Sequence, residues 1–345
     1  MQKRLILAIT LAALMLGGSF LAAQSAPNVT VYGRAHVTTD YLSNGDKSGL
    51  NLSSNSSRLG FKASTDLGGK LKAIMQIEQE VWWDNGAGNF ASRDTFVGLQ
   101  GEFGTIRFGH FDTPLKAVRS KTDFFGDQIG DARNLTRLRD NYGSVNDFDT
   151  RFRNSIHYRS PSLSGLVFDL DYSSNTDAGV NPQNTGRSAI STSLSYFSKA
   201  FYAAGAYEHK EETKSNAIRL GASYSFGDLK IAGLGQFATI KADGKDDQKI
   251  STFGVGASYK VAKPATLKAQ YYLLNADGDD RNAGMFALGL DYSLGKAFRL
   301  LLAYASTSND ELARYTMSAG GHGDKVYPAQ GNTASGFSFG FRYDF

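Results

Sequence analysis

The sequence contains no cysteine among its 345 residues, so its fold relies on neither disulfide bonds nor thiolate zinc sites. An excess of one charge is also lacking. The chain carries 37 Lys and Arg against 33 Asp and Glu, whereas a nucleic-acid-binding domain shows a strong basic excess. Five scattered histidines have no metal-ligand spacing: His36, His110, His157, His209 and His322. We therefore expect no metal, no other cofactor and no nucleic-acid partner.

Long apolar runs are also missing, with one exception at the N-terminus. Residues 5–23 are uncharged and apolar, follow Lys3 and Arg4, and lead into small residues that end at Ala26. This is the three-part layout of a secretory signal peptide. We predict a signal peptide at residues 1–26, cleaved near residues 23–26, followed by a single domain at residues 27–345. A membrane anchor is the alternative, which Gly17 and Gly18 weaken.

After residue 26, no apolar stretch approaches the eighteen or so residues of a membrane helix. The exported chain is therefore either soluble or crosses a membrane as strands. Composition does not decide between them, because lipid-facing and interior residues that alternate along a strand average to a soluble-looking mixture. Periodicity has to decide.

Apolar and polar residues alternate in sixteen segments, most of them nine to fourteen residues long. Membrane strands need about nine to eleven residues, whereas globular strands average five or six. In one segment Ile218, Leu220 and Tyr224 share a face opposite Arg219 and Ser223. The segments are residues 29–42, 58–66, 70–83, 93–101, 105–111, 151–159, 165–173, 187–197, 201–210, 217–226, 229–240, 250–261, 266–275, 284–294, 298–307 and 335–345.

The connections between these segments alternate between tight turns and longer polar loops, of which residues 112–150 and 308–334 are the largest. Aromatic rings gather beside the tight turns, as in the interfacial girdle of a membrane barrel. Residues 335–345 place five rings on one face, and so apolar a strand should pair with the first segment rather than leave an edge open. The sequence thus predicts an all-β protein, a closed 16-stranded antiparallel transmembrane β-barrel.

Specific segments carry a family resemblance: VTVYGRAHV, SSRLGFKASTDLGGKLKA, SRDTFVGLQGEFGTIRFGH, RNSIHY and the closing aromatic strand. In this order and spacing, the chain resembles the general diffusion porins of Gram-negative outer membranes. The resemblance implies an outer-membrane homotrimer, in contact with lipid and lipopolysaccharide. It also implies a third loop, residues 112–150, folded inward to narrow a water-filled channel for ions and small hydrophilic solutes. Phe345 would belong to the signal read by the barrel assembly machinery.

The resemblance and the alternation together suggest which residues line the narrow part of the channel. Arg34, Arg58, Arg93 and Arg153 match the basic wall positions of the family. Alternation places Phe152 and Ile156 toward lipid, which turns Arg151 and Arg153 inward. Opposite them, the third loop offers Asp123, Asp127 and Asp131, which a short helical turn could align on one side.

Opposed guanidinium and carboxylate rows create a transverse field that orients dipolar solutes. The alternative interpretation is that these charges only pin the loop to the wall, and the two roles could also hold together. The arginines slightly outnumber the aspartates, which favours a weak anion preference. The function predicted is a passive porin and not an enzyme, because no serine and histidine are seen to pair for hydrolysis. A solute-specific channel with a saturable binding site is the main alternative.

Overall fold

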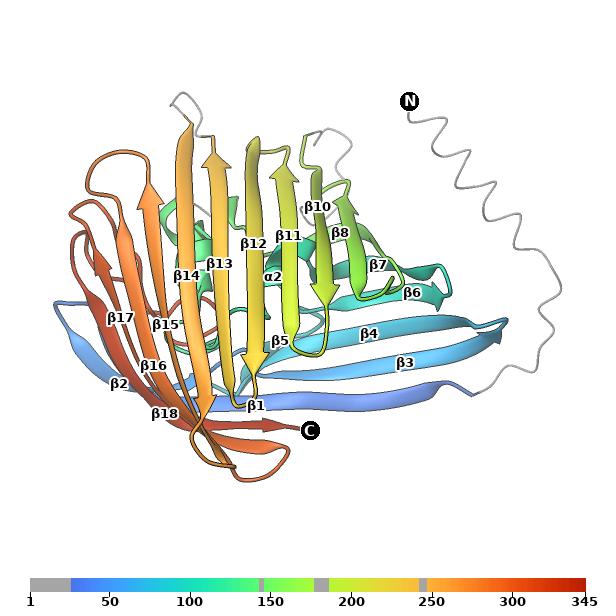
Figure 1. The fold of residues 1–345 in the computed structure, drawn as a ribbon, viewed down its shortest axis with the longest axis horizontal. Helices are drawn as coiled ribbons and strands as arrows, with labels where there is room; N and C mark the ends of the chain where they lie inside the picture. The colour runs from blue at the N-terminus through green and yellow to red at the C-terminus, as the bar shows by residue number, and fades with distance from the viewer. Residues whose placement is uncertain (1–25, 143–145, 177–185, 242–246) are drawn as a thin grey trace.

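The computed structural model describes residues 26–345 apart from 143–145, 177–185 and 242–246 (Figure 1). The predicted signal peptide lies outside the described residues, so it stays a prediction. Within the described part, no helix is both long and apolar enough to cross a membrane.

Eighteen strands and three short helices make up the described chain. The strands are β1 (Asn28–Ser43), β2 (Ser48–Ser54), β3 (Arg58–Gly68), β4 (Leu71–Trp82), β5 (Ala87–Asn89), β6 (Thr95–Gly101), β7 (Gly104–Asp112), β8 (Arg151–Arg159), β9 (Leu166–Ser173), β10 (Ala189–Phe197), β11 (Phe201–Lys210), β12 (Ser215–Phe226), β13 (Leu229–Ile240), β14 (Gln248–Lys260), β15 (Ala265–Ala276), β16 (Ala283–Ser293), β17 (Phe298–Asn309) and β18 (Ala334–Asp344). The helices are α2 (Pro114–Arg119), α3 (Arg133–Thr136) and α4 (Arg139–Tyr142).

The strands form one closed antiparallel sheet of sixteen strand positions. β2 and β3 both pair with β1, and β5 and β6 both pair with β4, so each of these two couples occupies a single position. The barrel closes where β18 pairs with β1, from Arg34 opposite Asp344 to Ser43 opposite Ser335. The predicted fold is therefore confirmed, including the pairing of the last strand with the first.

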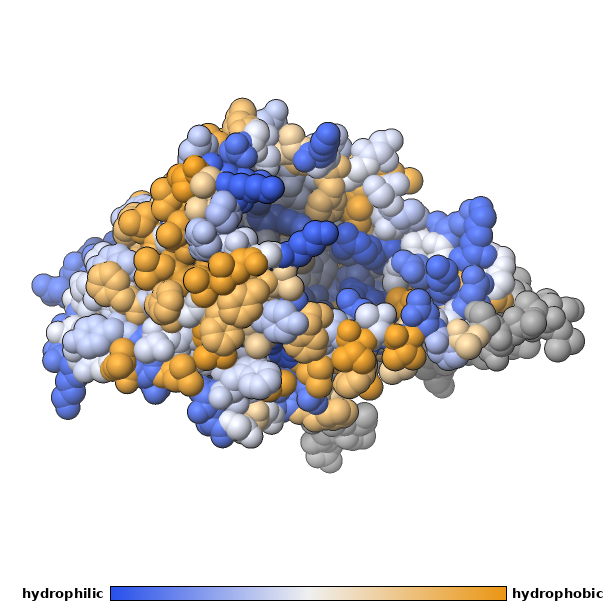
Figure 2. All heavy atoms as spheres, turned by 90° about the horizontal axis from the view of Figure 1, so that it is seen from below, coloured by the Kyte–Doolittle hydropathy of each residue, from blue (hydrophilic) through white to orange (hydrophobic). Residues whose placement is uncertain are grey.

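The two faces of the sheet differ as the alternation predicts. In β12, Ile218 and Leu220 are exposed on the outer face, whereas Ala217 and Arg219 are fully buried on the inner one. Apolar side chains cover a broad part of the surface, and hydrophilic ones line a hollow (Figure 2). Rings beside the tight turns touch across strands, with centroids of Phe201 and Tyr224 6.4 Å apart. A charge at mid-depth on such an outer face would cost about 2 to 4 kcal/mol in a membrane.

The third loop, between β7 and β8, packs on the inner face of the sheet. Proline suits the start of a helix, and Thr113 caps α2 by accepting a hydrogen bond from Lys116 N. The α2 helix lies behind β11 and β12 in Figure 1, and Leu115 N donates to Ser191 Oγ at 3.1 Å. Apolar loop side chains are buried there: Leu115, Val118, Phe125, Ile129 and Leu135. The loop is thus held inside the barrel by both packing and hydrogen bonds.

One predicted strand phase is wrong. Phe152 was expected to face outward, but only 1% of it is exposed, whereas Ile156 in the same strand is 46% exposed. The pairing of β7 with β8 shifts register between Gly109 and Phe111, and Asn154 adopts a positive φ of 50°. Such a bulge adds a residue to one strand and reverses the direction of the side chains beyond it.

Candidate functional site

Asp127, near the middle of the third loop, is the centre of a charge cluster inside the barrel. Its Oδ2 lies 3.2 Å from Arg34 Nη1 on β1, and its Oδ1 lies 2.6 Å from Arg133 Nη2 in α3. Arg34 also reaches Asp344 on the closing strand, with Nε to Oδ1 at 2.8 Å. The cluster therefore ties the third loop to the seam of the barrel.

Two further arginines lie beside this cluster and share one carboxylate. Arg58 opposes Arg34 directly in the β1–β3 pairing. Glu78 on β4 lies 2.6 Å from Arg93 Nε and 3.9 Å from Arg58 Nε, and it accepts a hydrogen bond from Tyr32 Oη at 2.8 Å. Of the three predicted wall residues here, Arg93 is not in a strand; it lies between β5 and β6.

The electrostatics of Asp127 reflect these neighbours. Burial alone would raise the pKa of its carboxyl, but surrounding guanidiniums hold that pKa well below its usual value. They belong to Arg133, Arg58, Arg93 and Arg34. Asp127 is consequently ionised at any physiological pH. One carboxylate thus faces four cations, only one of which comes from its own loop.

The three predicted aspartates do not share one side of a helical turn, as the spacing suggested. No helix covers residues 123–131, and Asp127 has a φ of 64°. The side chain of Asp127 is 17% exposed, whereas those of Asp123 and Asp131 are fully buried. Asp131 binds Arg133 at 2.6 Å and also accepts a 2.7 Å hydrogen bond from Asp127 N. Asp131 therefore supports the loop backbone rather than facing the opposite wall.

Asp123 is also a support of the loop. Its Oδ2 lies 2.7 Å from Arg119 Nη1, and its Oδ1 accepts hydrogen bonds from Phe125 N at 2.9 Å and Gln270 Nε2 at 3.0 Å. Burial and then the nearby Asp131 carboxylate raise the pKa of Asp123 to about 6, although Arg119 opposes the shift.

The last two predicted wall residues lie apart from the Asp127 cluster. Arg151 forms ion pairs with two other carboxylates: its Nε lies 2.7 Å from Asp94 Oδ1, and its Nη2 lies 2.9 Å from Asp112 Oδ1. Arg153 is exposed and borders two depressions, one with the outward-facing Phe108 and Ile156 and one with Arg151 and Lys210, so its inward placement stays a prediction. Arg153 lies within the bulge between Phe152 and Ser155, where the alternation of side chains is interrupted.

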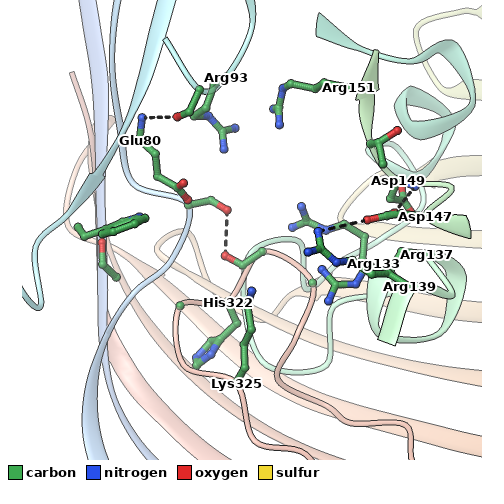
Figure 3. Close-up of a pocket in the computed structure, with 18 of the residues that line it drawn as sticks. Glu80, Arg93, Arg133, Arg137, Arg139, Asp147, Asp149, Arg151, His322 and Lys325 are labelled. Atoms are coloured by element: carbon green, nitrogen blue, oxygen red, sulfur yellow. Dashed lines mark hydrogen bonds and ion pairs between the residues drawn. The ribbon is translucent and has the colours of Figure 1, made fainter. Parts of the chain in front are cut away.

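A cavity of about 580 Å³ adjoins the cluster, and half of the residues that line it are charged. In Figure 3, Arg93 and Arg151 point into it from one side, and Arg133, Arg137 and Arg139 from another. Seven Lys and Arg and four Asp and Glu line it, so basic groups predominate: Lys116, Arg93, Arg133, Arg137, Arg139, Arg151 and Lys325 against Glu80, Asp84, Asp147 and Asp149.

The sequence-based prediction missed Glu78 and the role of Arg133. A signal for Glu78 was present, because it alternates with the outward-facing Met75 and Ile77 in β4. No comparable signal existed for Arg133, since its contacts with Asp127 and Asp131 depend on the path of the third loop.

Comparison with known proteins identifies the family. The model of the family described as "Gram-negative porin" matches residues 10–312. The chain belongs to the Gram-negative porin family. It is 30% identical to outer membrane porin protein 32 of Delftia acidovorans, in an alignment that covers 100% of both chains. It is 26% identical to major outer membrane protein P.IB of Neisseria sicca, over 72% of this chain and 76% of that one.

Solved structures agree with this assignment. The anion-selective porin from Comamonas acidovorans is similar with a TM-score of 0.83 and 26% identity, covering 93% of this porin and 100% of that chain. The trimer form of OmpT from Vibrio cholerae, at 20% identity and a TM-score of 0.70, shares the fold. This porin is therefore a β-barrel of the Gram-negative outer membrane and forms a channel, as predicted. Its relatives are channels rather than enzymes.

Proposed function

We propose that this porin passes ions and small hydrophilic solutes passively through a constriction formed where Asp127 faces Arg34, Arg58 and Arg93. The observation that carries the proposal is the convergence of these guanidiniums, from three segments of the wall, on one partly exposed loop carboxylate. Charged groups at close quarters select ions and orient dipolar solutes. Arginine suits the wall because it stays charged at any relevant pH.

We also propose a weak preference for anions. The arginines that surround Asp127 and Glu78 outnumber these two carboxylates. Asp123 and Asp131 are buried within the loop. The adjoining cavity is likewise lined by more basic than acidic groups. The structurally similar Comamonas acidovorans porin is named for its anion selectivity. All of these observations support a preference for anions.

The test is the reversal potential in a salt gradient across a planar bilayer, for wild type and for Arg58→Glu. The wild-type channel should prefer anions weakly, and Arg58→Glu should shift the preference toward cations. Arg281→Glu, in the external loop between β15 and β16, makes the same charge change away from the cluster and should leave the potential unchanged. A clear cation preference of the wild type would contradict the proposed preference for anions. An unchanged potential in Arg58→Glu would place Arg58 outside the constriction.

The interpretation that the charges only pin the loop predicts a different result. Arg58→Glu would then loosen the third loop and raise conductance without changing the reversal potential. Because the carboxylate introduced by Arg58→Glu would lie beside Glu78, folding of the variant is checked by its heat-modifiable migration in electrophoresis.

A solute-specific channel remains the second candidate, and the basic cavity beside the cluster is the observation that favours it. Single-channel conductance with competing solutes separates the two. Flux that rises linearly with concentration supports a general channel, whereas saturation and block by one solute class support a specific site.

We further propose that the porin is a homotrimer, since the OmpT relative of the same fold is described in a trimer form. Cross-linking of the protein in native outer membranes tests this. We also propose that lipopolysaccharide contacts the barrel and that Phe345 is read by the barrel assembly machinery.

A further inference from the structure

The final loop, residues 310–333 between β17 and β18, folds into the barrel rather than staying outside it. Its central part is almost completely inaccessible to solvent, although the loop is long and polar. The buried residues of this part are Tyr315, Thr316, Met317, Ser318, Ala319 and His322. Something inside the barrel must therefore hold them.

The third loop provides one set of contacts. Met317 O accepts hydrogen bonds from Gly130 N and from Asn134 Nδ2, both at 2.7 Å. Asn134 Oδ1 in turn accepts from Ala319 N at 2.9 Å. Asn134 thus bridges two residues of the final loop, and all these groups are buried. The two loops are joined directly, through backbone and side-chain atoms.

The wall near the β2–β3 junction provides the second set. His322 Nε2 lies 3.0 Å from Asp40 Oδ2 on β1, with 1% and 0% of their side chains exposed. Ser56 Oγ donates to Gly321 O at 2.9 Å. Two more N–H groups of the final loop donate to this wall, at 2.8 Å each: Gly323 N to Asn55 Oδ1 and Asp324 N to Ser53 Oγ. The final loop therefore spans from the wall to the third loop.

Between these anchors, Gly321 lies against the Asp127 cluster. A Cβ placed on Gly321 would overlap both Arg133 Nη2 and Asp127 Oδ1, the two groups that form the 2.6 Å ion pair. The lack of a side chain at this one position leaves room for that pair. A methyl group there would have to displace the guanidinium, the carboxylate or the loop itself.

We propose that the final loop is a second positioning element of the constriction, and that Gly321 determines selectivity by letting Arg133 pair with Asp127. This inference rests on the proposed function. With Arg133 in place, Asp127 is opposed by a cation of its own loop as well as by the wall. Without it, more of the negative charge of Asp127 acts on permeating ions, which lowers the preference for anions.

The experiment is a double-mutant cycle on single channels, read as the reversal potential in a salt gradient. Gly321→Ala and Arg133→Ala should each shift the potential toward cations, because both take the guanidinium away from Asp127. In the Arg133→Ala background, Gly321→Ala should add little, since the displaced group is already gone. The matched control is Gly49→Ala in β2, where an added Cβ meets nothing within 4 Å, and it should behave as wild type.

The outcomes distinguish the two proposals. If Arg133→Ala shifts the potential and Gly321→Ala does not, the role of the final loop is refuted while the constriction stands. An effect of Gly321→Ala that persists undiminished in the Arg133→Ala background also refutes it. If Arg133→Ala and Arg58→Glu both leave the potential unchanged, the proposal that these residues form the constriction is refuted.

A second variant covers the case in which Gly321→Ala does not fold. His322→Ala removes the contact with Asp40 without adding atoms near Arg133. It should accelerate hydrogen exchange of residues 316–325 and shift the potential in the same direction as Arg133→Ala. Unchanged exchange and an unchanged potential would show that the wall contact does not position the loop.

Discussion

Asp127→Asn is the sharpest test of the constriction, because it removes one charge and leaves neither of its partners isolated. Arg34 retains Asp344 at 2.8 Å, and Arg133 retains Asp131 at 2.6 Å. Asparagine preserves the shape of the side chain and one acceptor oxygen. The barrel is therefore expected to fold normally, so that a change in selectivity comes from the loss of the Asp127 charge and of its ion pair with Arg34.

The size of the effect follows from Coulomb's law. A unit charge about 4 Å from a permeating ion changes its energy by about 1 kcal/mol in water. Removing a negative charge lowers the energy of an anion in the constriction and raises that of a cation by this amount. The energy difference between the two ions therefore changes by about 2 kcal/mol. Salt with a Debye length of about 10 Å reduces this by roughly a third. Since about 1.4 kcal/mol is tenfold, the anion-to-cation permeability ratio should rise by about tenfold.

The assay is the reversal potential of Asp127→Asn in a potassium chloride gradient, compared with wild type. Asp46→Asn, in the exposed turn between β1 and β2, makes the same change in net charge far from the cluster and serves as the control. If Asp127→Asn matched Asp46→Asn, the charge of Asp127 would have no effect on permeating ions, and the proposed constriction would have to lie elsewhere.

Two other predictions concern the loop and the barrel seam. The pKa of Asp123 is raised from 3.8 to about 6, so its stabilising protonated form is fully present below about pH 4 and lost as pH rises through about 6. Backbone amides of the third loop should therefore exchange faster at pH 7 than at pH 5 after correction for intrinsic rates, and Asp123→Asn should abolish this difference. Deleting Phe345 removes two backbone hydrogen bonds with Gly33, of 2.9 and 3.1 Å, at the seam. The fraction of the protein that is folded in the outer membrane should fall, while the channels that do form keep the wild-type conductance. If the conductance of these channels fell as much as the folded fraction, a role of Phe345 in assembly would be contradicted.

Side-chain alternation predicted the barrel because each face of a strand meets a different environment. The segment predicted at residues 217–226 is β12 in the structure, with Ile218 and Leu220 outside and Arg219 inside. A shift by one residue would exchange the two sets, so burial fixes the register strongly. Alternation fails at Phe152, because the bulge opposite Gly109 depends on backbone conformation rather than on polarity.

The candidate site was less predictable than the barrel, for a related reason. The inward direction of Arg34 and Arg58 follows from their strands, and these two residues are indeed neighbours across β1 and β3. The three loop aspartates looked equivalent by spacing, yet only Asp127 is partly exposed. Which carboxylate reaches the wall is decided by long-range contacts, such as that of Gly130 with Met317, and local sequence does not encode them.

Pinning the loop and creating a field across the channel can hold together, and the geometry makes the two roles inseparable at Asp127. Its contact with Arg34 attaches the third loop to the seam, and the same contact places a carboxylate among the wall guanidiniums. At Asp123 the two roles do separate, because that side chain is buried and binds only loop and wall groups. Asp127→Asn should therefore change selectivity, whereas Asp123→Asn should change loop exchange and leave selectivity near that of wild type. A result with these effects reversed would mean that the loop follows a different path in the membrane.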